Sequence, residues 1–484
     1  MLTVFVLSSL LLLFPQTPPP MAYEAASSGI TWQPYRLATD EGPIDAQLGR
    51  LRVPERRGDP DARQITIAFA RIPSTSANPG PPVIYLDGGP GGSGIGAARI
   101  PAFASLFRAL RASSDVILLS QRGTGMSDRV GCLGGAPLPG STLVSEARMI
   151  AGIASRHAAC AESLRAQGVD LAGYTTDESA DDIEAIRAAL GAPKVSLVGF
   201  SYGTHLAVAT LRRHGARIAR AVLLGTEGPA DTWKLPATYD RQVMTIDAML
   251  KGDPRTRAVM GDFAGTLRAL LARAAGAPLR VTFTAGNAER TMDVGAAGIL
   301  YLLRRDIGDS NDLPWIPAFV YETHAGDTRI LSQLLARRVP GLERGVHMMA
   351  AAMDCASAAP ADRLAAIRAQ APASIFGAMT NFPFPDICDA AGLAPIGPAF
   401  HAPVETPVPT LFVSGTLDTN TPPAQAEAVM RGFAHASHLV IEGAGHESTL
   451  TAGVRDRIAA FLSGNAVESA TLPGEPIEFR LPRT

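Results

Sequence analysis

The chain has 484 residues, more than one compact core of ordinary size holds, so we expect a main domain with a large insertion or a second domain. Hydrophobic residues make up 46% and charged residues 18% of the composition, as is usual in globular proteins. The 43 basic and 45 acidic residues nearly cancel, which gives no sign of polyanion binding, and we expect no nucleic-acid partner.

Residues 1–14 form an almost uninterrupted apolar run that is followed by Pro15. The run is shorter than the roughly 20 residues needed to span a bilayer, and its length is typical of the hydrophobic region of a signal peptide. We therefore predict a signal peptide over residues 1–27 and an exported protein, periplasmic or secreted, without a stable membrane span. No lysine or arginine precedes the run, so a mis-assigned start upstream of a cytosolic Met21 is the alternative.

Two segments after the leader, 45–53 and 64–72, have strand-like sequences and are joined by a turn-like sequence, which predicts an antiparallel hairpin. Short apolar runs separated by helical segments follow at 83–86, 116–119, 195–198 and 221–224. Continuous apolar strands that alternate with helices indicate a mostly parallel sheet covered by helices on both faces.

This alternation stops near residue 229, where helix-like segments with proline-rich breaks take over, and it resumes with strands at 410–413 and 438–441. We therefore predict a mainly helical cap inserted into an α/β core. Ligands of open α/β sheets bind at the carboxyl edge of the sheet, which this cap would cover. The predicted parts are a first core part at 28–228, the cap at 229–408, a second core part at 409–466 and a C-terminal tail at 467–484.

The four cysteines form no Cys-x-x-Cys pair and have no metal-ligand spacing, so we expect no metal site. In an exported chain their even number predicts two disulfides. Of the three possible pairings, sequence order favours Cys132 with Cys160 and Cys355 with Cys388. Four buried free thiols are the alternative.

The sequence Gly199-Phe200-Ser201-Tyr202-Gly203 directly follows the apolar run at 195–198 and opens a helix-compatible segment. A serine flanked by glycines at a strand-to-helix junction is typical of a nucleophile elbow, because the tight turn leaves no room for Cβ atoms. We therefore predict that Ser201 is a nucleophile in acyl transfer.

A serine nucleophile needs a general base, and the base needs an acid to orient it. Asp418 and His446 lie just beyond the strands at 410–413 and 438–441, at the sheet edge to which Ser201 belongs. We predict His446 as the base and Asp418 as the orienting acid. Asp386 and Asp389, both in the insertion, are weaker alternatives to Asp418.

The glycine-rich loop at 87–94 follows the strand at 83–86 and supplies a candidate oxyanion hole. The backbone N–H groups of Gly89 and Tyr202 are the predicted donors, with Gly88 as a second choice for the first of them. The loop also fits the dinucleotide-binding pattern G-x-G-x-x-G, but Pro90 has no N–H to offer a pyrophosphate. We expect no nucleotide and no other cofactor.

With these residues placed, the chain resembles the proline iminopeptidase and tripeptidyl aminopeptidase family of α/β-hydrolase serine peptidases. The resemblance covers roughly residues 45–230 and 405–465 and includes the loops of Asp418 and His446. It implies the α/β-hydrolase fold and a triad of Ser201, His446 and Asp418. Its other motifs lie at 88–94, 121–127, 174–176 and 199–203.

Members of the resembled family release amino acids or short peptides from free N-termini and hold the substrate ammonium with acidic side chains near the cap. Glu227, just after the strand at 221–224, is the candidate here, and a solvated or structural glutamate is the alternative. Asp87 and Ser120 depart from the iminopeptidase pattern, so a specificity for proline is not carried over.

An esterase or lactonase with the same triad is the alternative function, followed by a non-catalytic binding protein. Oligomeric state stays open.

Overall fold

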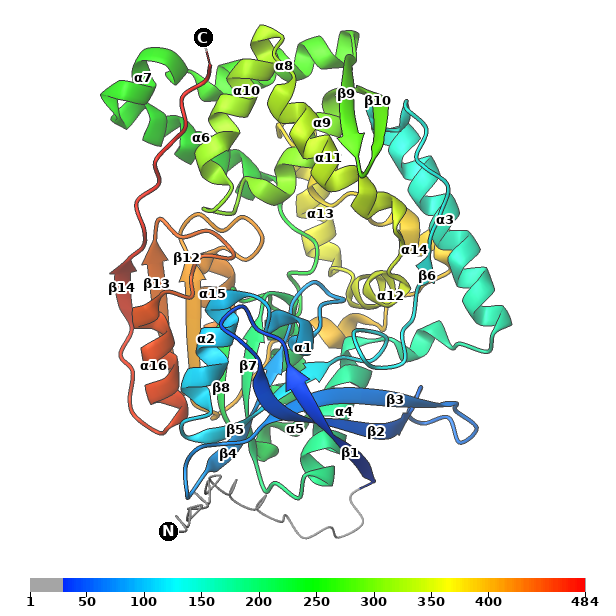
Figure 1. Ribbon diagram of the computed structural model, residues 1–484, viewed down its shortest axis with the longest axis vertical. Coiled ribbons are helices and arrows are strands. Elements are labelled where there is room, and N and C mark those ends of the chain that lie inside the picture. Colours follow the sequence, from blue (N-terminus) through cyan, green and yellow to red (C-terminus); the bar gives the residue numbers. More distant parts are fainter. Residues whose placement is uncertain (1–28, 484) are drawn as a thin grey trace, which may run out of the picture.

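The computed structural model describes residues 29–483, so the predicted signal peptide at 1–27 lies outside the described residues. A large mixed sheet forms the centre of the fold, and a mainly helical layer lies over one of its edges (Figure 1). Within residues 29–483, no helix combines the length and apolar character needed to cross a bilayer.

The central sheet of the described chain has ten strands in the order β1-β2-β3-β5-β4-β7-β8-β12-β13-β14. The first four are antiparallel to one another, and from β5 to β14 all neighbours are parallel. The mostly parallel sheet and the hairpin at 45–53 and 64–72 are thereby confirmed. The strands are β1 (Ile30–Leu37), β2 (Ile44–Pro54), β3 (Gln64–Ile72), β4 (Gly80–Leu86), β5 (Ser114–Ser120), β7 (Val195–Phe200), β8 (Ile218–Leu224), β12 (Thr410–Gly415), β13 (Ala436–Glu442) and β14 (Ala470–Pro473).

Alternate residues of the central strands enter two separate hydrophobic cores, as the period of a strand requires. Ile84 and Leu86 of β4 belong to one core, whereas Val83 and Tyr85 belong to the other. Helices therefore cover both faces of the sheet. Those packed on the first face are α4 (Thr176–Ala189), α5 (Tyr202–His214) and α15 (Pro423–Met430); those on the second are α1 (Gly94–Ala97), α2 (Pro101–Leu110) and α16 (Ala452–Leu462).

The register of the parallel strands brings their carboxyl ends to one edge. Leu86 is paired with Gly199, Phe200 with Leu224, and Leu224 with Val413. The loops that follow β4, β7, β8, β12 and β13 therefore start side by side, and these loops carry the residues singled out above.

The segment between β8 and β12, residues 229–408, is called the cap below, and much of it has its own hydrophobic core. Besides helices it contains an antiparallel hairpin of β9 (Leu279–Ala285) and β10 (Ala288–Val294), which the sequence analysis had not anticipated. The cap helices are α6 (Pro236–Gly252), α7 (Pro254–Met260), α8 (Phe263–Gly276), α9 (Ala296–Asp306), α10 (Ile316–Ala325), α11 (Arg329–Glu343), α12 (Met348–Ser357), α13 (Ala361–Gln370) and α14 (Asp386–Ala391).

A long helix from the first core part also contacts the cap. This helix, α3 (Glu146–Ala166), packs against α14, and Arg165 donates a hydrogen bond to the carbonyl oxygen of Ala391 at 2.7 Å. The two-residue strand β6 (Cys132–Leu133), just before α3, pairs with β11 (Gly345–Val346) of the cap.

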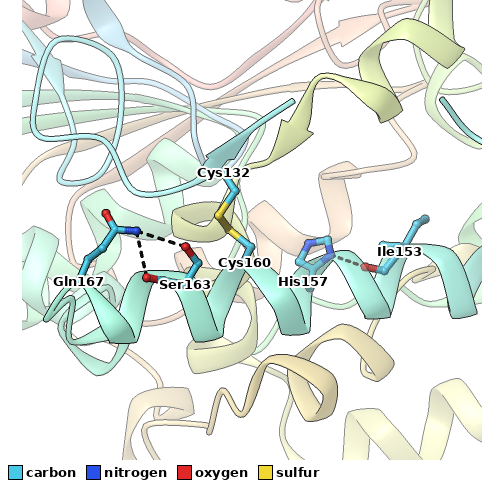
Figure 2. Close-up of a disulfide and its surroundings, with 6 residues drawn as sticks. All are labelled: Cys132, Ile153, His157, Cys160, Ser163 and Gln167. Carbon is cyan, nitrogen blue, oxygen red and sulfur yellow. Dashed lines mark hydrogen bonds between the residues drawn. A yellow bond between two sulfur atoms is a disulfide. The ribbon is translucent and has the colours of Figure 1, made fainter. Parts of the chain in front are cut away.

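Both disulfides have the pairing that sequence order favours, so the alternative of four free thiols is wrong. Cys132 and Cys160 join β6 to α3, and Figure 2 shows the bond between that strand and the middle of the helix. Cys355 and Cys388 join α12 to α14. Both bonds therefore reinforce the region where the cap meets the first core part.

Candidate active site

Ser201 occupies a strained backbone position between β7 and α5, with φ 54° and ψ −126°. Such a conformation is sparsely populated for residues other than glycine and costs on the order of 1–3 kcal/mol. The flanking glycines make the turn possible. A Cβ at Gly199 would lie 2.5 Å from the carbonyl oxygen of Gly203, and one at Gly203 would lie 2.0 Å from that of Leu86.

The three residues of the predicted triad form one hydrogen-bonded chain. Ser201 Oγ lies 2.9 Å from His446 Nε2, and His446 Nδ1 lies 2.7 Å from Asp418 Oδ2. His446 and Asp418 are only 7% and 3% exposed. The serine hydroxyl can therefore pass its proton to an imidazole that a buried carboxylate orients.

The carboxylate of Asp418 is itself held by its own loop. The N–H groups of Asn420 and Thr421 donate to Oδ1 at 2.8 and 2.9 Å, and the Thr421 hydroxyl donates to Oδ2 at 2.6 Å. These bonds fix the carboxylate opposite His446 Nδ1. Thr421 was not among the predicted site residues, although a hydroxyl side chain three residues after the orienting acid could have indicated a hydrogen bond to it.

The pKa values of the buried pair move apart. Burial opposes ionisation of Asp418, but the charge of His446 and the hydrogen bonds from His446 and Thr421 outweigh it and lower the pKa of the carboxyl. Burial likewise opposes protonation of His446, yet Asp418 outweighs it and raises the pKa of the imidazole. The pair is thus arranged to stabilise the imidazolium that forms when the imidazole accepts a proton.

The predicted oxyanion loop packs directly against the nucleophile. A Cβ built on Gly88 would lie 2.9 Å from the Cβ of Ser201, so glycine is needed for this approach. Gly89 has φ 120°, which favours glycine, and lines the same cavity as Ser201. Tyr202 is the first residue of α5, where backbone N–H groups have no partner within the helix. Both predicted donors therefore lie beside the nucleophile.

Ser201 and His446 open into a cavity of about 590 Å³ between the sheet edge and the cap. Its walls are rich in charge. Most of the cations have partners: Arg337 and Arg338 both contact the buried carboxylate of Asp306, and Arg304 donates to the carbonyl oxygens of Met379 and Phe382. Within residues 29–483, no group of three or more histidine, cysteine or acidic residues is arranged to hold a metal ion.

A family model described as alpha/beta hydrolase fold matches residues 81–452 of the chain. The chain belongs to the α/β-hydrolase fold family. Tripeptidyl aminopeptidase of Streptomyces coelicolor is 34% identical over 200 residues, which cover 38% of this chain and 36% of that protein. Serine protease Hip1 of Mycobacterium tuberculosis is 30% identical over 221 residues, 43% of this chain and 42% of that protein. The match thus spans less than half of either relative.

Among solved structures, proline iminopeptidase of Mycobacterium smegmatis aligns with 85% of this α/β-hydrolase and 97% of its own chain, at 14% identity and a TM-score of 0.38.

Glu227, the predicted ammonium ligand of this α/β-hydrolase, does not line the catalytic cavity. Its side chain is buried, and Lys234 Nζ lies 2.5 Å from its Oε2. His205 lies on its other side, with Nδ1 at 3.8 Å from Oε1. Lys234, by contrast, does line the cavity. The position of Glu227 therefore favours the structural alternative, because its charge is already neutralised by a lysine that faces the site.

Asp354 of α12 is an acidic residue that the sequence analysis missed, and it does line the cavity. Among the described residues, its carboxyl group has no hydrogen bond or ion pair. Burial, reinforced by the negative charge of Glu227, raises its pKa well above the ordinary value. The sequence held a signal for it, since Asp354 is the only charged residue between His347 and Asp362 in a strongly apolar segment.

Proposed function

We propose that this α/β-hydrolase is an exported serine aminopeptidase that releases amino acids or short peptides from free N-termini. The observation that carries the hydrolase part is the bond of 2.9 Å between Ser201 Oγ and His446 Nε2, with Asp418 behind the imidazole. The names of the partial relatives, an aminopeptidase and a serine protease, support the peptidase part. The two disulfides support export, because such bonds persist in oxidising compartments.

The proposed reaction follows from this geometry. Ser201 Oγ attacks the scissile carbonyl carbon while His446 Nε2 takes the hydroxyl proton, and the N–H groups of Gly89 and Tyr202 bind the oxyanion. His446 then gives the proton to the departing amine, which leaves an acyl-enzyme. Water attacks this ester, again with His446 as base, and the released acid frees Ser201.

Asp354 takes the role first predicted for Glu227. A free α-ammonium group is a cation that needs an unpaired acidic group in the same cavity, and the carboxyl group of Asp354 is one. Its raised pKa suits this role, because binding an ammonium group would favour the charged carboxylate over the neutral acid. An acyl group without an amine cannot form this ion pair with Asp354, so the site should favour peptides with free N-termini.

A substrate panel tests the proposal: peptides with free and with blocked N-termini, and short-chain esters. We expect the purified protein to prefer free peptides and Ser201→Ala to lose all hydrolysis. Asp354→Asn should raise KM for free peptides by about tenfold or more, since one charge-assisted contact is worth roughly 1.5–3 kcal/mol. It should leave ester hydrolysis nearly unchanged.

Asp362→Asn is the matched control, because Asp362 is an exposed carboxylate of the cap that does not line the cavity. Preference for blocked peptides or esters would contradict the aminopeptidase assignment and favour the esterase alternative. Equal losses on peptides and esters in Asp354→Asn would contradict the ammonium role alone.

A further inference from the structure

A second cavity, of about 660 Å³, shares the glycine-rich oxyanion loop with the catalytic cavity. Gly88, Gly89 and Gly92 line the catalytic cavity, whereas Gly91 lines the second one. The opposite wall comes from the end of α11, β11 and the start of α12. A Cβ on Gly91 would lie 3.3 Å from that of Ala350, so the loop and α12 touch where the two cavities adjoin.

The side chains that line this second cavity have charge of one sign only. Arg129 and Arg344 line it together with His347, and no acidic residue does. Neither guanidinium has a hydrogen bond or an ion pair with any residue in the described range 29–483. The catalytic cavity differs, because two of its arginines form ion pairs with Asp306.

Two permanently charged guanidinium groups around one space, with no carboxylate to compensate, create a positive potential that attracts anions. Guanidinium groups bind the paired oxygens of carboxylates and phosphates in a fork geometry. The cavity wall also includes Gly123, Gly125 and Gly131, which have no side chain to keep a small ligand away from the backbone.

We propose that this second cavity is a binding site for a small oxyanion group, a carboxylate or a phosphate. Binding of an anion in this cavity does not require that the protein be a peptidase. Two sources supply such a group: the C-terminal carboxylate of a peptide lying in the catalytic cavity, or a separate small anion. The first source is near, because the oxyanion loop beside Ser201 lines both cavities.

An anion in this position would contact the oxyanion loop through Gly91. The Gly92 N–H donates a hydrogen bond of 3.0 Å to the Gly88 carbonyl oxygen, and Gly91 lies within the turn that this bond closes. Occupancy is therefore expected to change the kinetics of the neighbouring site as well as to add binding energy.

Calorimetric titration of Ser201→Ala protein with inorganic phosphate and with succinate, at constant ionic strength, measures the site without any catalysis. We expect saturable binding that weakens by at least about tenfold when Arg129→Gln and Arg344→Gln are added. The matched control adds Arg268→Gln and Arg431→Gln instead, which removes two exposed arginines that line neither cavity. Equal affinities in the three proteins would overturn the proposal.

A second arm uses the active enzyme and compares peptides ending in a free carboxylate with the same peptides ending in an amide. If the substrate supplies the anion, the arginine pair variant raises KM for the free acids only. If the KM ratio stays unchanged while phosphate or succinate binding is lost, the ligand is a separate anion. No effect of the arginine pair on either measurement would refute the site, whether or not the protein is a peptidase.

Discussion

The reactivity of Ser201 depends on His446 and also on residues that do not touch the substrate. The turn that strains its backbone depends on Gly199 and Gly203, and the base that activates it depends on Asp418. Asp418 in turn depends on Thr421 and the N–H groups of its own loop. These hydrogen bonds fix both nitrogen atoms of the imidazole, so His446 keeps one orientation and one tautomer.

The raised pKa of His446 makes the activity sensitive to pH. His446 must be neutral to accept the serine proton, and its pKa lies above the usual 6.5 because Asp418 stabilises the imidazolium. Hydrolysis therefore requires a pH above the pKa of His446 and is lost as the pH falls through that pKa. Asp418→Asn should move this acidic limb of kcat/KM to lower pH and reduce kcat by about 10³–10⁴-fold, as measured from a pH–rate profile.

Asp389→Asn is the control for this profile, because Asp389 was a weaker sequence candidate and is exposed on α14. Its profile should match that of the unaltered protein. An acidic limb that stays in place in Asp418→Asn would refute the pairing of Asp418 with His446.

The residues that could be predicted are those close to a strand end. Ser201, Asp418 and His446 each follow an apolar run. Parallel strands bring their carboxyl ends together in any arrangement of the helices. Asp354 could not be placed in this way, because its position depends on how α12 packs across the sheet edge. Glu227 shows that a position after a strand is not sufficient. It follows a strand as predicted, but Lys234, its ion-pair partner, lines the cavity in its place.

At the scale of elements, the central strands were predictable because their apolar runs are short and alternate with longer helical segments, and this length and order favour buried parallel strands over buried helices. The β9–β10 hairpin was missed although its signal is present: Val281 and Phe283 alternate with exposed residues and a Gly286-Asn287 turn follows. The helical pattern around it led us to expect a mainly helical cap and no strand pair within it. The strand β1 was missed because four of its eight residues are exposed, so its sequence carries no apolar run.

Arg122 joins three elements below the catalytic edge. Its fully buried guanidinium contacts Asp182 of α4 at 2.7 and 2.8 Å and donates to the carbonyl oxygens of Glu55 and Gly173 at 2.6 Å. The residue after β2, the loop after β5, the turn at Gly173 and the middle of α4 therefore share one charged group.

Asp182→Asn should lower the free energy of unfolding by about 3 kcal/mol, because it leaves a buried guanidinium without its main counter-charge. Asp181→Asn is the neighbouring control. The partners of Asp181, Arg213 and His214, are partly exposed, so the loss should stay within about 1 kcal/mol. Denaturant titration of both variants measures the difference, and equal losses would show that Arg122 does not depend on Asp182.

At the scale of the whole molecule, the C-terminal tail connects the core to the cap. Its strand β14 pairs with β13, and the chain then runs from the edge of the sheet up to the cap helices (Figure 1). The Arg480 N–H donates to the Pro314 carbonyl oxygen at 2.7 Å, and the Arg483 N–H donates to Glu322 at 2.9 Å. Phe479 is buried in the hydrophobic core of the cap.

The same hydrophobic core includes Leu417, the residue just before Asp418. The packing that places the cap thus also holds the loop of the orienting acid. A substitution that weakens the packing of the cap is therefore expected to disturb the triad, even though the cap supplies none of its three residues.

Phe479→Ala tests this coupling. Removing a buried aromatic ring should lower the free energy of unfolding by about 3 kcal/mol, whereas Leu481→Ala, at a tail residue that is 37% exposed, should change it by no more than about 0.5 kcal/mol. Denaturant titration gives the two values, and the rate of labelling of Ser201 by a phosphonate probe reports the triad. Because Leu417 shares the core that Phe479 fills, labelling should slow in Phe479→Ala under conditions where the protein is still folded. Unchanged labelling together with a loss of stability would mean that the tail holds the cap without supporting the loop of Asp418.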